Sequence, residues 1–238
     1  MFQRSHGRTA TQIRPIKITP NYLKYPLGSA LCEYGDTKVI CSATLEDYVP
    51  GWLRATKGRG WLTAEFSMLP FSTLDRSKRE RHFLSGRTHE IQRLIGRSLR
   101  GIMDLNLLGE RTMIIDCDVL QADGGTRTAS VTGAFVALKL AVDELLRKKK
   151  IQANPIKDSV AGVSLGLLDE EILVDLDFEE DQKVDSDLNI VMTSSGEILE
   201  VQGTGEKKAI DKSLLGPALD YAQAALEDIF AEQGKALD

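Results

Sequence analysis

Residues 123–127, Asp-Gly-Gly-Thr-Arg, have the composition of an anion-binding turn, because they stand where an alternating apolar stretch ends and a long helical pattern begins. Glycines let the backbone approach a ligand closely, and the unpaired N–H groups at a helix start favour negative charge. Thr126 could add a hydroxyl donor and Arg127 a charged one. A plain strand-to-helix turn with Thr126 as the N-cap explains the same residues. This segment alone leaves both interpretations open.

A second candidate for anion binding is Arg87, which follows Ser-Gly at the start of another helical pattern. Its charge would lie near the positive end of its own helix, which is unfavourable unless an anion is present. A solvated loop arginine is the alternative, and the local sequence does not choose between the two.

Seven arginines fall between residues 76 and 100, and the planar guanidinium suits bidentate contact with phosphate. The run 76–81 is the better candidate for contact with an RNA backbone. Arginines at helical spacing are more often surface or salt-bridge residues, and we assign that default to three of them: Arg93, Arg97 and Arg100.

Seven carboxylates are crowded between residues 175 and 187, where they must repel one another unless solvent or a cation separates them. Asp181 and Asp187, six residues apart across a turn, could converge on one Mg²⁺. Magnesium often takes only one or two carboxylates and fills its other positions with water and substrate phosphate. A solvated acidic loop is the alternative. The full set is Asp175, Asp177, Glu179, Glu180, Asp181, Asp185 and Asp187.

The charge of the 238-residue chain is divided unevenly, although its net value is only −5. Residues 1–150 carry 24 Lys and Arg against 15 Asp and Glu, whereas residues 151–238 carry 6 against 20. Such asymmetry favours a basic surface for a polyanion.

The three cysteines form no C-x-x-C pair, residues 1–15 have no apolar core, and no apolar run approaches the ~20 residues of a membrane helix. We expect a cytoplasmic protein.

Hydrophobic periodicity predicts strands followed by a helix in each of two parts. The pattern favours an α+β fold over a strictly alternating α/β fold, and we expect one compact domain, residues 1–238, with two lobes. Its three histidines have no metal-ligand spacing, and motifs of serine hydrolases, Walker nucleotide sites and zinc proteases are missing from the sequence. The predicted strands are 29–34, 38–45, 61–69, 112–122, 160–168, 172–176, 188–193 and 198–202, and the predicted helices begin at 87 and cover 127–148 and 214–230.

Several strings have a more specific meaning, among them EYGDTKV at 33–39, GWLTAE at 60–65, EIQRLIGR at 90–97 and EVQGT at 200–204. With them the chain resembles the ribonuclease PH family over nearly its whole length. Further matching segments are 7–8, 12–15, 86–88, 116–119, 127–128, 175–177, 180–181 and 187–189.

The resemblance implies the RNase PH fold, which is like domain 2 of ribosomal protein S5, and a homo-hexamer built as a trimer of dimers. It implies a phosphorolytic 3′→5′ exoribonuclease, a tRNA nucleotidyltransferase, that uses inorganic phosphate and releases nucleoside 5′-diphosphates. The implied RNA is the 3′ trailer of precursor tRNA, and some members also trim rRNA. The implied cofactor is Mg²⁺.

The resemblance also assigns roles to individual residues. Arg87, Gly125, Thr126 and Arg127 match the family's phosphate site, and Asp181 and Asp187 match its catalytic, metal-associated carboxylates. Arg76 and Arg79 match basic loop residues linked to assembly and RNA contact, and we include Arg93 as a third RNA-binding candidate.

One departure from the family concerns ring assembly and the grip on RNA. Phe71 stands where the family commonly has arginine after Met-Leu-Pro, and the loop before Gly86 is shorter.

Two alternative functions are a non-catalytic RNA-binding subunit of an exosome-like ring and a small-molecule phosphotransferase. The first would be expected to lack the phosphate arginines or the aspartates, which are present here. The second would be expected to have a nucleotide-binding glycine pattern, which the sequence lacks.

Overall fold

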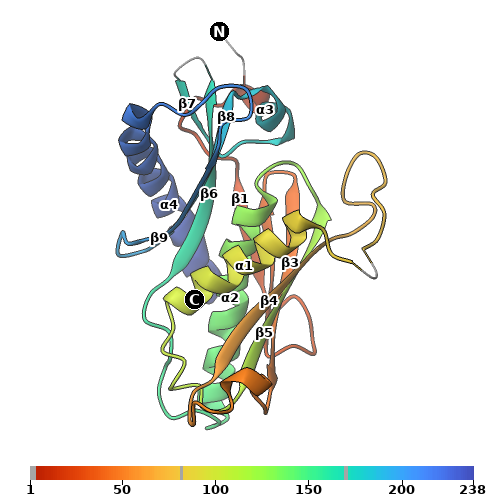
Figure 1. The fold of residues 1–238 in the computed structure, drawn as a ribbon, viewed down its shortest axis with the longest axis vertical. Helices are drawn as coiled ribbons and strands as arrows, with labels where there is room; N and C mark the ends of the chain where they lie inside the picture. The colour runs from red at the N-terminus through yellow and green to blue at the C-terminus, as the bar shows by residue number, and fades with distance from the viewer. Residues whose placement is uncertain (1–3, 81–82, 169–170) are drawn as a thin grey trace.

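Two β-sheets form the framework of the computed structural model, which describes residues 4–80, 83–168 and 171–238. The first sheet is antiparallel except where β4 and β5 run parallel, and the second is antiparallel throughout its described residues (Figure 1). In spatial order, the first contains β1 (Ile16–Pro20), β2 (Gly28–Tyr34), β3 (Thr37–Glu46), β5 (Thr112–Gln121) and β4 (Trp61–Met68). The second contains β7 (Glu171–Val174), β6 (Val160–Leu168), β8 (Ser186–Thr193) and β9 (Ile198–Thr204).

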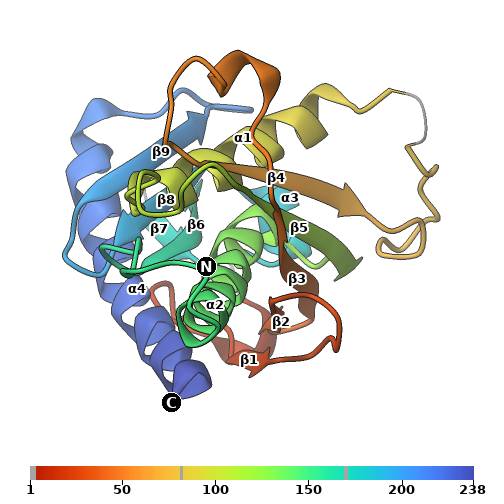
Figure 2. The same cartoon turned by 90° about the horizontal axis from the view of Figure 1, so that it is seen from below.

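Helices join the two sheets. The long helix α2 (Thr126–Arg147) contacts β2 and β3 of the first sheet and β6 of the second (Figure 2). Helix α4 (Leu215–Leu237) packs on β6 and β1, and α1 (Gly86–Gly101) packs on β4, α2 and β9. The short α3 (Phe178–Lys183) precedes β8. Among the described residues, no helix combines the length and apolar character that a membrane span needs.

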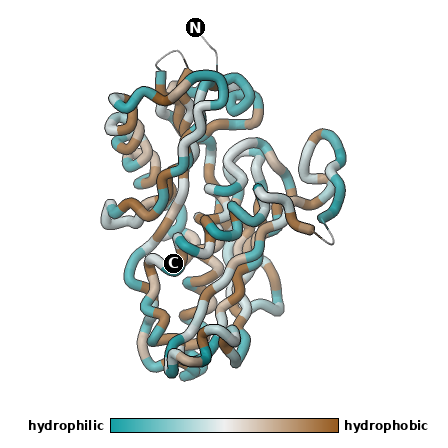
Figure 3. Tube along the Cα trace, viewed as in Figure 1, coloured by the Kyte–Doolittle hydropathy of each residue, from teal (hydrophilic) through white to brown (hydrophobic). Residues whose placement is uncertain are grey.

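Patterning of small and apolar residues explains this arrangement. Strand β5 alternates, so that its apolar residues enter the core while Asp116 and Asp118 lie on the opposite face. Helix α2 is buried over most of its surface, and at Gly133 an added Cβ would stand 2.7 Å from the Cβ of Cys32. The core therefore runs from one sheet through α2 to the other, and Figure 3 shows hydrophobic segments concentrated in the interior.

The α+β fold with two lobes is confirmed, and each predicted strand and helix corresponds to one in the structure. Two elements were not predicted. Strand β1 has no clear strand pattern in the sequence, because Pro15 precedes it and Pro20 is its last residue. It nevertheless pairs with β2 along its length. Helix α3 lies in the segment that the sequence analysis treated as an acidic turn, since its six residues include no apolar stripe.

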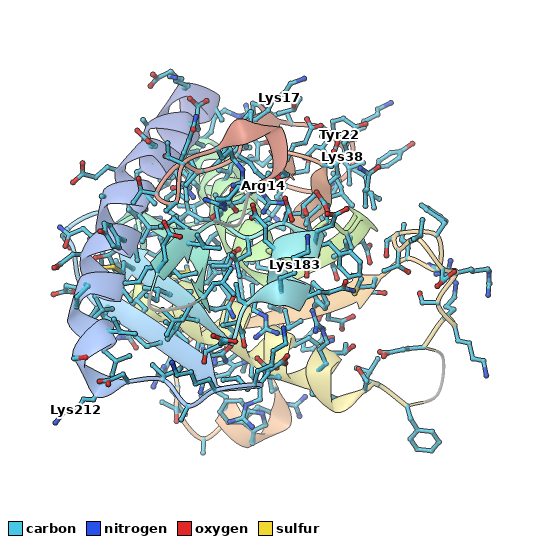
Figure 4. The ribbon with its side chains drawn as sticks, turned by 90° about the horizontal axis from the view of Figure 1, so that it is seen from above. Arg14, Lys17, Tyr22, Lys38, Lys183 and Lys212 are labelled. Carbon is cyan, nitrogen blue, oxygen red and sulfur yellow. The ribbon has the colours of Figure 1, made fainter. Side chains whose placement is uncertain are left out.

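A buried network of charges ties the N-terminal segment to the second lobe. Arg4 and Arg8 both contact Glu180, at 2.8 and 2.9 Å, and Arg14 contacts Asp175 at 2.7 Å. These five side chains are at most 4% exposed. Figure 4 shows Arg14 in the interior, whereas Lys17 points outward. Because an unpaired buried charge is costly, the network holds residues 4–14 against the start of α3.

The same network reaches the turn before α2. Arg14 donates to the backbone carbonyl of Asp123, and Gly124 adopts a φ of +71°. A Cβ on Gly124 would lie 2.4 Å from the carbonyl oxygen of Leu176, so only glycine allows the turn to pack this closely. The glycine turn and the segment leading into α3 are thus held side by side.

We predict that Glu180→Ala destabilises the fold by about 3–5 kcal/mol, because it leaves Arg4 and Arg8 buried without their shared partner. The matched control is Glu179→Ala on the same helix. Glu179 is 80% exposed and pairs only with Lys183 among the ion pairs of the described residues, so its loss should cost less than about 1 kcal/mol. Urea unfolding of both variants measures the difference, and equal destabilisation would contradict the role of the network.

Candidate active site

A cavity of about 330 Å³ brings together the residues that the sequence analysis identified in four separate segments. Its walls come from the start of α1, the turn before α2, helix α3 and strand β8. All six predicted phosphate-binding and catalytic residues line it: Arg87, Gly125, Thr126, Arg127, Asp181 and Asp187.

Glycines shape the anion-binding end of the cavity. Gly125 is the N-cap of α2, with a φ of +63°, and it makes no side-chain capping bond. Thr126 is therefore the first helical residue and not the N-cap that the simpler interpretation required. The first backbone N–H groups of a helix have no partner within it and carry partial positive charge. A 22-residue helix thus points this positive end at the cavity.

Two arginines supply full positive charge at this end, from corresponding positions of two helices. Arg127 is the second residue of α2 and donates to Oε1 of Glu90 and Oε1 of Gln202, at 3.1 Å each. Arg87 is the second residue of α1 and is exposed. In the described part of the chain, no hydrogen bond or ion pair holds the side chain of Arg87, although its charge acts on Asp181 and Asp187. Arg127 is therefore held in place, whereas the guanidinium of Arg87 is available to a ligand.

Two carboxylates make another part of the cavity lining acidic. Asp181 lies on α3 and Asp187 on β8, so the two come from adjacent elements and not from one loop. Burial raises the pKa of Asp181, and the charge of Asp187 raises it further. Burial also raises the pKa of Asp187, while Arg127 acts in the opposite direction. Nδ2 of Asn189 donates to Oδ2 of Asp187 at 3.3 Å.

Asp181 and Asp187 could supply some, but not all, of the ligands of a hard divalent cation. In residues 4–80, 83–168 and 171–238 there is no group of three or more side chains placed to ligate a metal. Two close carboxylates with raised pKa values still fit Mg²⁺, because bringing a cation between them relieves both burial and repulsion. Water and substrate oxygens would complete its coordination.

The predicted RNA-binding arginines lie elsewhere. Arg76 and Arg79 are exposed on the loop between β4 and α1, which projects from the body of the fold in Figure 1. Arg93 is exposed on α1, and none of the three lines the cavity. The default of a surface salt bridge is confirmed for Arg97, which pairs with Glu200 at 2.6 Å. It is wrong for Arg100, which is half-buried, lies 4.7 Å from the ring centre of Trp61 and donates to the carbonyl of Leu62.

The cavity also contains residues that the sequence analysis missed. Phe178 and Glu206 line it, together with Asn189 and Ser164. Phe178 could have been found from the Asp177-x-x-Glu180 spacing, because both bonds of a capping box are formed there and mark a helix start. The other residues lie on strands and a loop with no comparable local pattern.

Comparisons with known proteins agree with this geometry. Residues 12–142 match the model of the 3′ exoribonuclease family, domain 1, and residues 158–225 match domain 2 of the same family. Ribonuclease PH of Moorella thermoacetica is 53% identical over 98% of this chain and 94% of its own length, and that of Bacillus cereus is 50% identical over 98% and 96%.

A solved structure shows the same fold at much lower identity. The Archaeoglobus fulgidus exosome with RNA bound to the active site contains a chain that is 22% identical, with a TM-score of 0.82 over 97% of this chain and 92% of that one. The family predicted from the sequence strings is therefore confirmed. With both family models matched and relatives identical at half of all positions, the chain belongs to the 3′ exoribonuclease family, among the ribonuclease PH enzymes.

Proposed function

We propose that this chain removes nucleotides from the 3′ end of RNA by phosphorolysis, transferring each to inorganic phosphate and releasing a nucleoside 5′-diphosphate. The observation that carries the proposal is one cavity lined by two arginines, the start of a helix and two carboxylates. The relatives named Ribonuclease PH support it. The proposed substrate is the 3′ trailer of precursor tRNA, with rRNA as a second one.

Inorganic phosphate binds at the basic end in this proposal. The N–H groups around Gly125 and the hydroxyl of Thr126 donate hydrogen bonds to it, and Arg87 and Arg127 neutralise its charge. Glu90 and Gln202 hold the Arg127 side chain before phosphate arrives, so little ordering remains at binding. The reaction joins two anions, and positioning with charge neutralisation accounts for most of its catalysis.

The carboxylates act on the scissile phosphodiester. An oxygen of the bound phosphate forms a bond to the phosphorus while the bond to the 3′ oxygen of the shortened RNA breaks, and that oxygen takes a proton. Without a bound cation, the raised pKa of Asp181 favours a protonated carboxyl that donates this proton. With a cation held by the ionised carboxylates, a water molecule is the donor. Asp181 and Asp187 would also hold Mg²⁺, which when bound supplies positive charge to the scissile phosphate.

RNA outside the cavity meets the exposed arginines in this proposal. Arg76, Arg79 and Arg93 contact the backbone, so recognition is largely independent of sequence. We propose a homo-hexamer, a trimer of dimers, as the working assembly, in which the exposed apolar Phe71 and Leu74 become covered. The cytoplasmic location and the single-domain organisation stay predictions.

A non-catalytic ring subunit is the second candidate, because the fold also resembles an exosome chain. Such a subunit has no need of a complete set of reacting groups. Here Arg87, Arg127, Asp181 and Asp187 all face one cavity, which favours the catalytic function.

The first prediction for activity concerns the products. We expect 3′-extended tRNA incubated with the protein and Mg²⁺ to yield nucleoside diphosphates only when inorganic phosphate is present. Chromatography of the products, with and without phosphate, makes the measurement. Monophosphates released without phosphate would indicate a hydrolase and contradict the proposal. RNA binding without shortening would favour the non-catalytic subunit.

We predict that Arg87→Ala and Arg127→Ala each lower kcat/KM by about 10²–10³, because each removes a donor that acts on the transferred charge. Arg97→Ala is the matched control, since Arg97 lies on the same helix as Arg87 and pairs with Glu200. Its rate should stay within a few-fold of the parent. Initial rates at varied phosphate concentration separate the effects, and Arg87→Ala should leave thermal stability nearly unchanged because Arg87 is exposed.

We predict that Asp181→Asn abolishes most activity but raises the melting temperature at pH 8. Folding raises the pKa of Asp181 through burial and the charge of Asp187, so above that pKa the parent protein contains an unfavourably ionised carboxylate. As the pH falls through the raised pKa, Asp181 takes up a proton and the advantage of asparagine disappears. Calorimetry at pH 8 and pH 4.5 without divalent cations tests this. Glu179→Gln, outside the cavity, is the control, and an advantage independent of pH would contradict the prediction.

A further inference from the structure

Phe178 is a large apolar side chain that the core does not use. It is 47% exposed, and it belongs to neither of the two hydrophobic clusters in the described part of the chain. Its ring instead lines the cavity of the proposed active site. An exposed aromatic side chain at a ligand cavity calls for a contact other than core packing.

The position of Phe178 on α3 directs it to the same place as a proposed catalytic residue. Phe178 is the first residue of α3 and Asp181 the fourth, and residues three apart lie on one face of a helix. Both line the cavity, together with Gly124, Gly125 and Thr126 of the turn before α2. A nucleotide whose phosphate lies at Asp181 would therefore have its base or sugar within reach of the ring.

The backbone that carries Phe178 is firmly held. Asp177 and Glu180 form both bonds of a capping box around it, and the Phe178 N–H donates to Oδ1 of Asp123 at 3.3 Å. Glu180 is in turn fixed by Arg4 and Arg8. Because the backbone at Phe178 is already fixed, little of its conformational entropy remains to be lost when a ligand binds.

The side chains that line the cavity indicate which part of a nucleotide Phe178 would contact. Phe178 is the single aromatic among the described residues that line the cavity, and the rest of the lining is chiefly polar, charged or small. Aromatic side chains bind nucleobases by stacking, and they tolerate every sequence because each base has a π-face. Ribose and phosphate, by contrast, are matched by the polar groups of the cavity.

We propose that Phe178 is the stacking platform for the base of the 3′-terminal nucleotide. The proposal rests on the proposed function and adds a specificity-determining residue to it. Stacking aligns the last phosphodiester with Asp181 while leaving the identity of the base unread. This is the property that an enzyme removing one nucleotide after another requires.

The test compares two oligoribonucleotides that differ only in the last residue, which is either a normal nucleotide or an abasic ribonucleotide. We expect Phe178→Ala to raise the KM for the normal RNA about 5- to 100-fold, with the KM for phosphate unchanged. On the abasic RNA the variant and the parent should be equal. Phe178→Tyr should restore the parent KM, and Phe178→Leu, which keeps apolar bulk for folding, should behave like alanine.

Tyr25→Ala is the matched control, because Tyr25 is 91% exposed and does not line the cavity. It should affect both RNAs equally. Equal losses on both RNAs for Phe178→Ala, or no loss, would overturn the proposal, as would a change in oligomeric state that accounts for the loss. If the parent protein yields no diphosphates from either RNA, the proposed function itself is wrong. An active parent with an insensitive Phe178 variant refutes only the stacking platform.

Discussion

The burial of Arg4, Arg8 and Arg14 against carboxylates of the second lobe is the constraint on which the site depends. Desolvated charges are tolerated only when opposite charges and hydrogen bonds surround them, so the N-terminal segment can take just one position. That position holds Glu180, and with it α3 and Asp181. Through Arg14 the same network reaches Asp123 and the turn that begins α2. A set of ion pairs outside the cavity lining thus holds α3 and the turn before α2 beside one another.

The cavity combines basic residues from the first part of the chain with acidic residues from the second. Residues 1–150, rich in arginine, contribute Arg87 and Arg127, and residues 151–238, rich in carboxylates, contribute Asp181 and Asp187. Neither part alone could bind an anion and also act on a phosphodiester. This division explains how a chain with a net charge of −5 can place two arginines in one cavity.

Function and stability oppose one another at the acidic end. Burial raises the pKa of both aspartates, which means that the folded chain disfavours their charged forms. Such strain is typical of sites that must hold a cation or a proton in one place. At the basic end the conflict is smaller, because Glu90 and Gln202 already satisfy Arg127 and water can solvate the exposed Arg87.

The family, the α+β fold and six of the residues that line the cavity follow from the sequence, because strand alternation, helical spacing and short strings around glycine and arginine are local properties. Local patterns do not indicate β1, whose pairing with β2 outweighs the effect of Pro15 and Pro20. They mark α3 only by the Asp177-x-x-Glu180 spacing, and the helix depends on buried arginines that lie far away in the chain. Contacts in the folded chain alone show that Arg97 pairs with Glu200, that Arg100 lies against Trp61, and that Glu206 lines the same cavity as Phe178. Those outcomes depend on contacts between residues far apart in the chain, which no local pattern records.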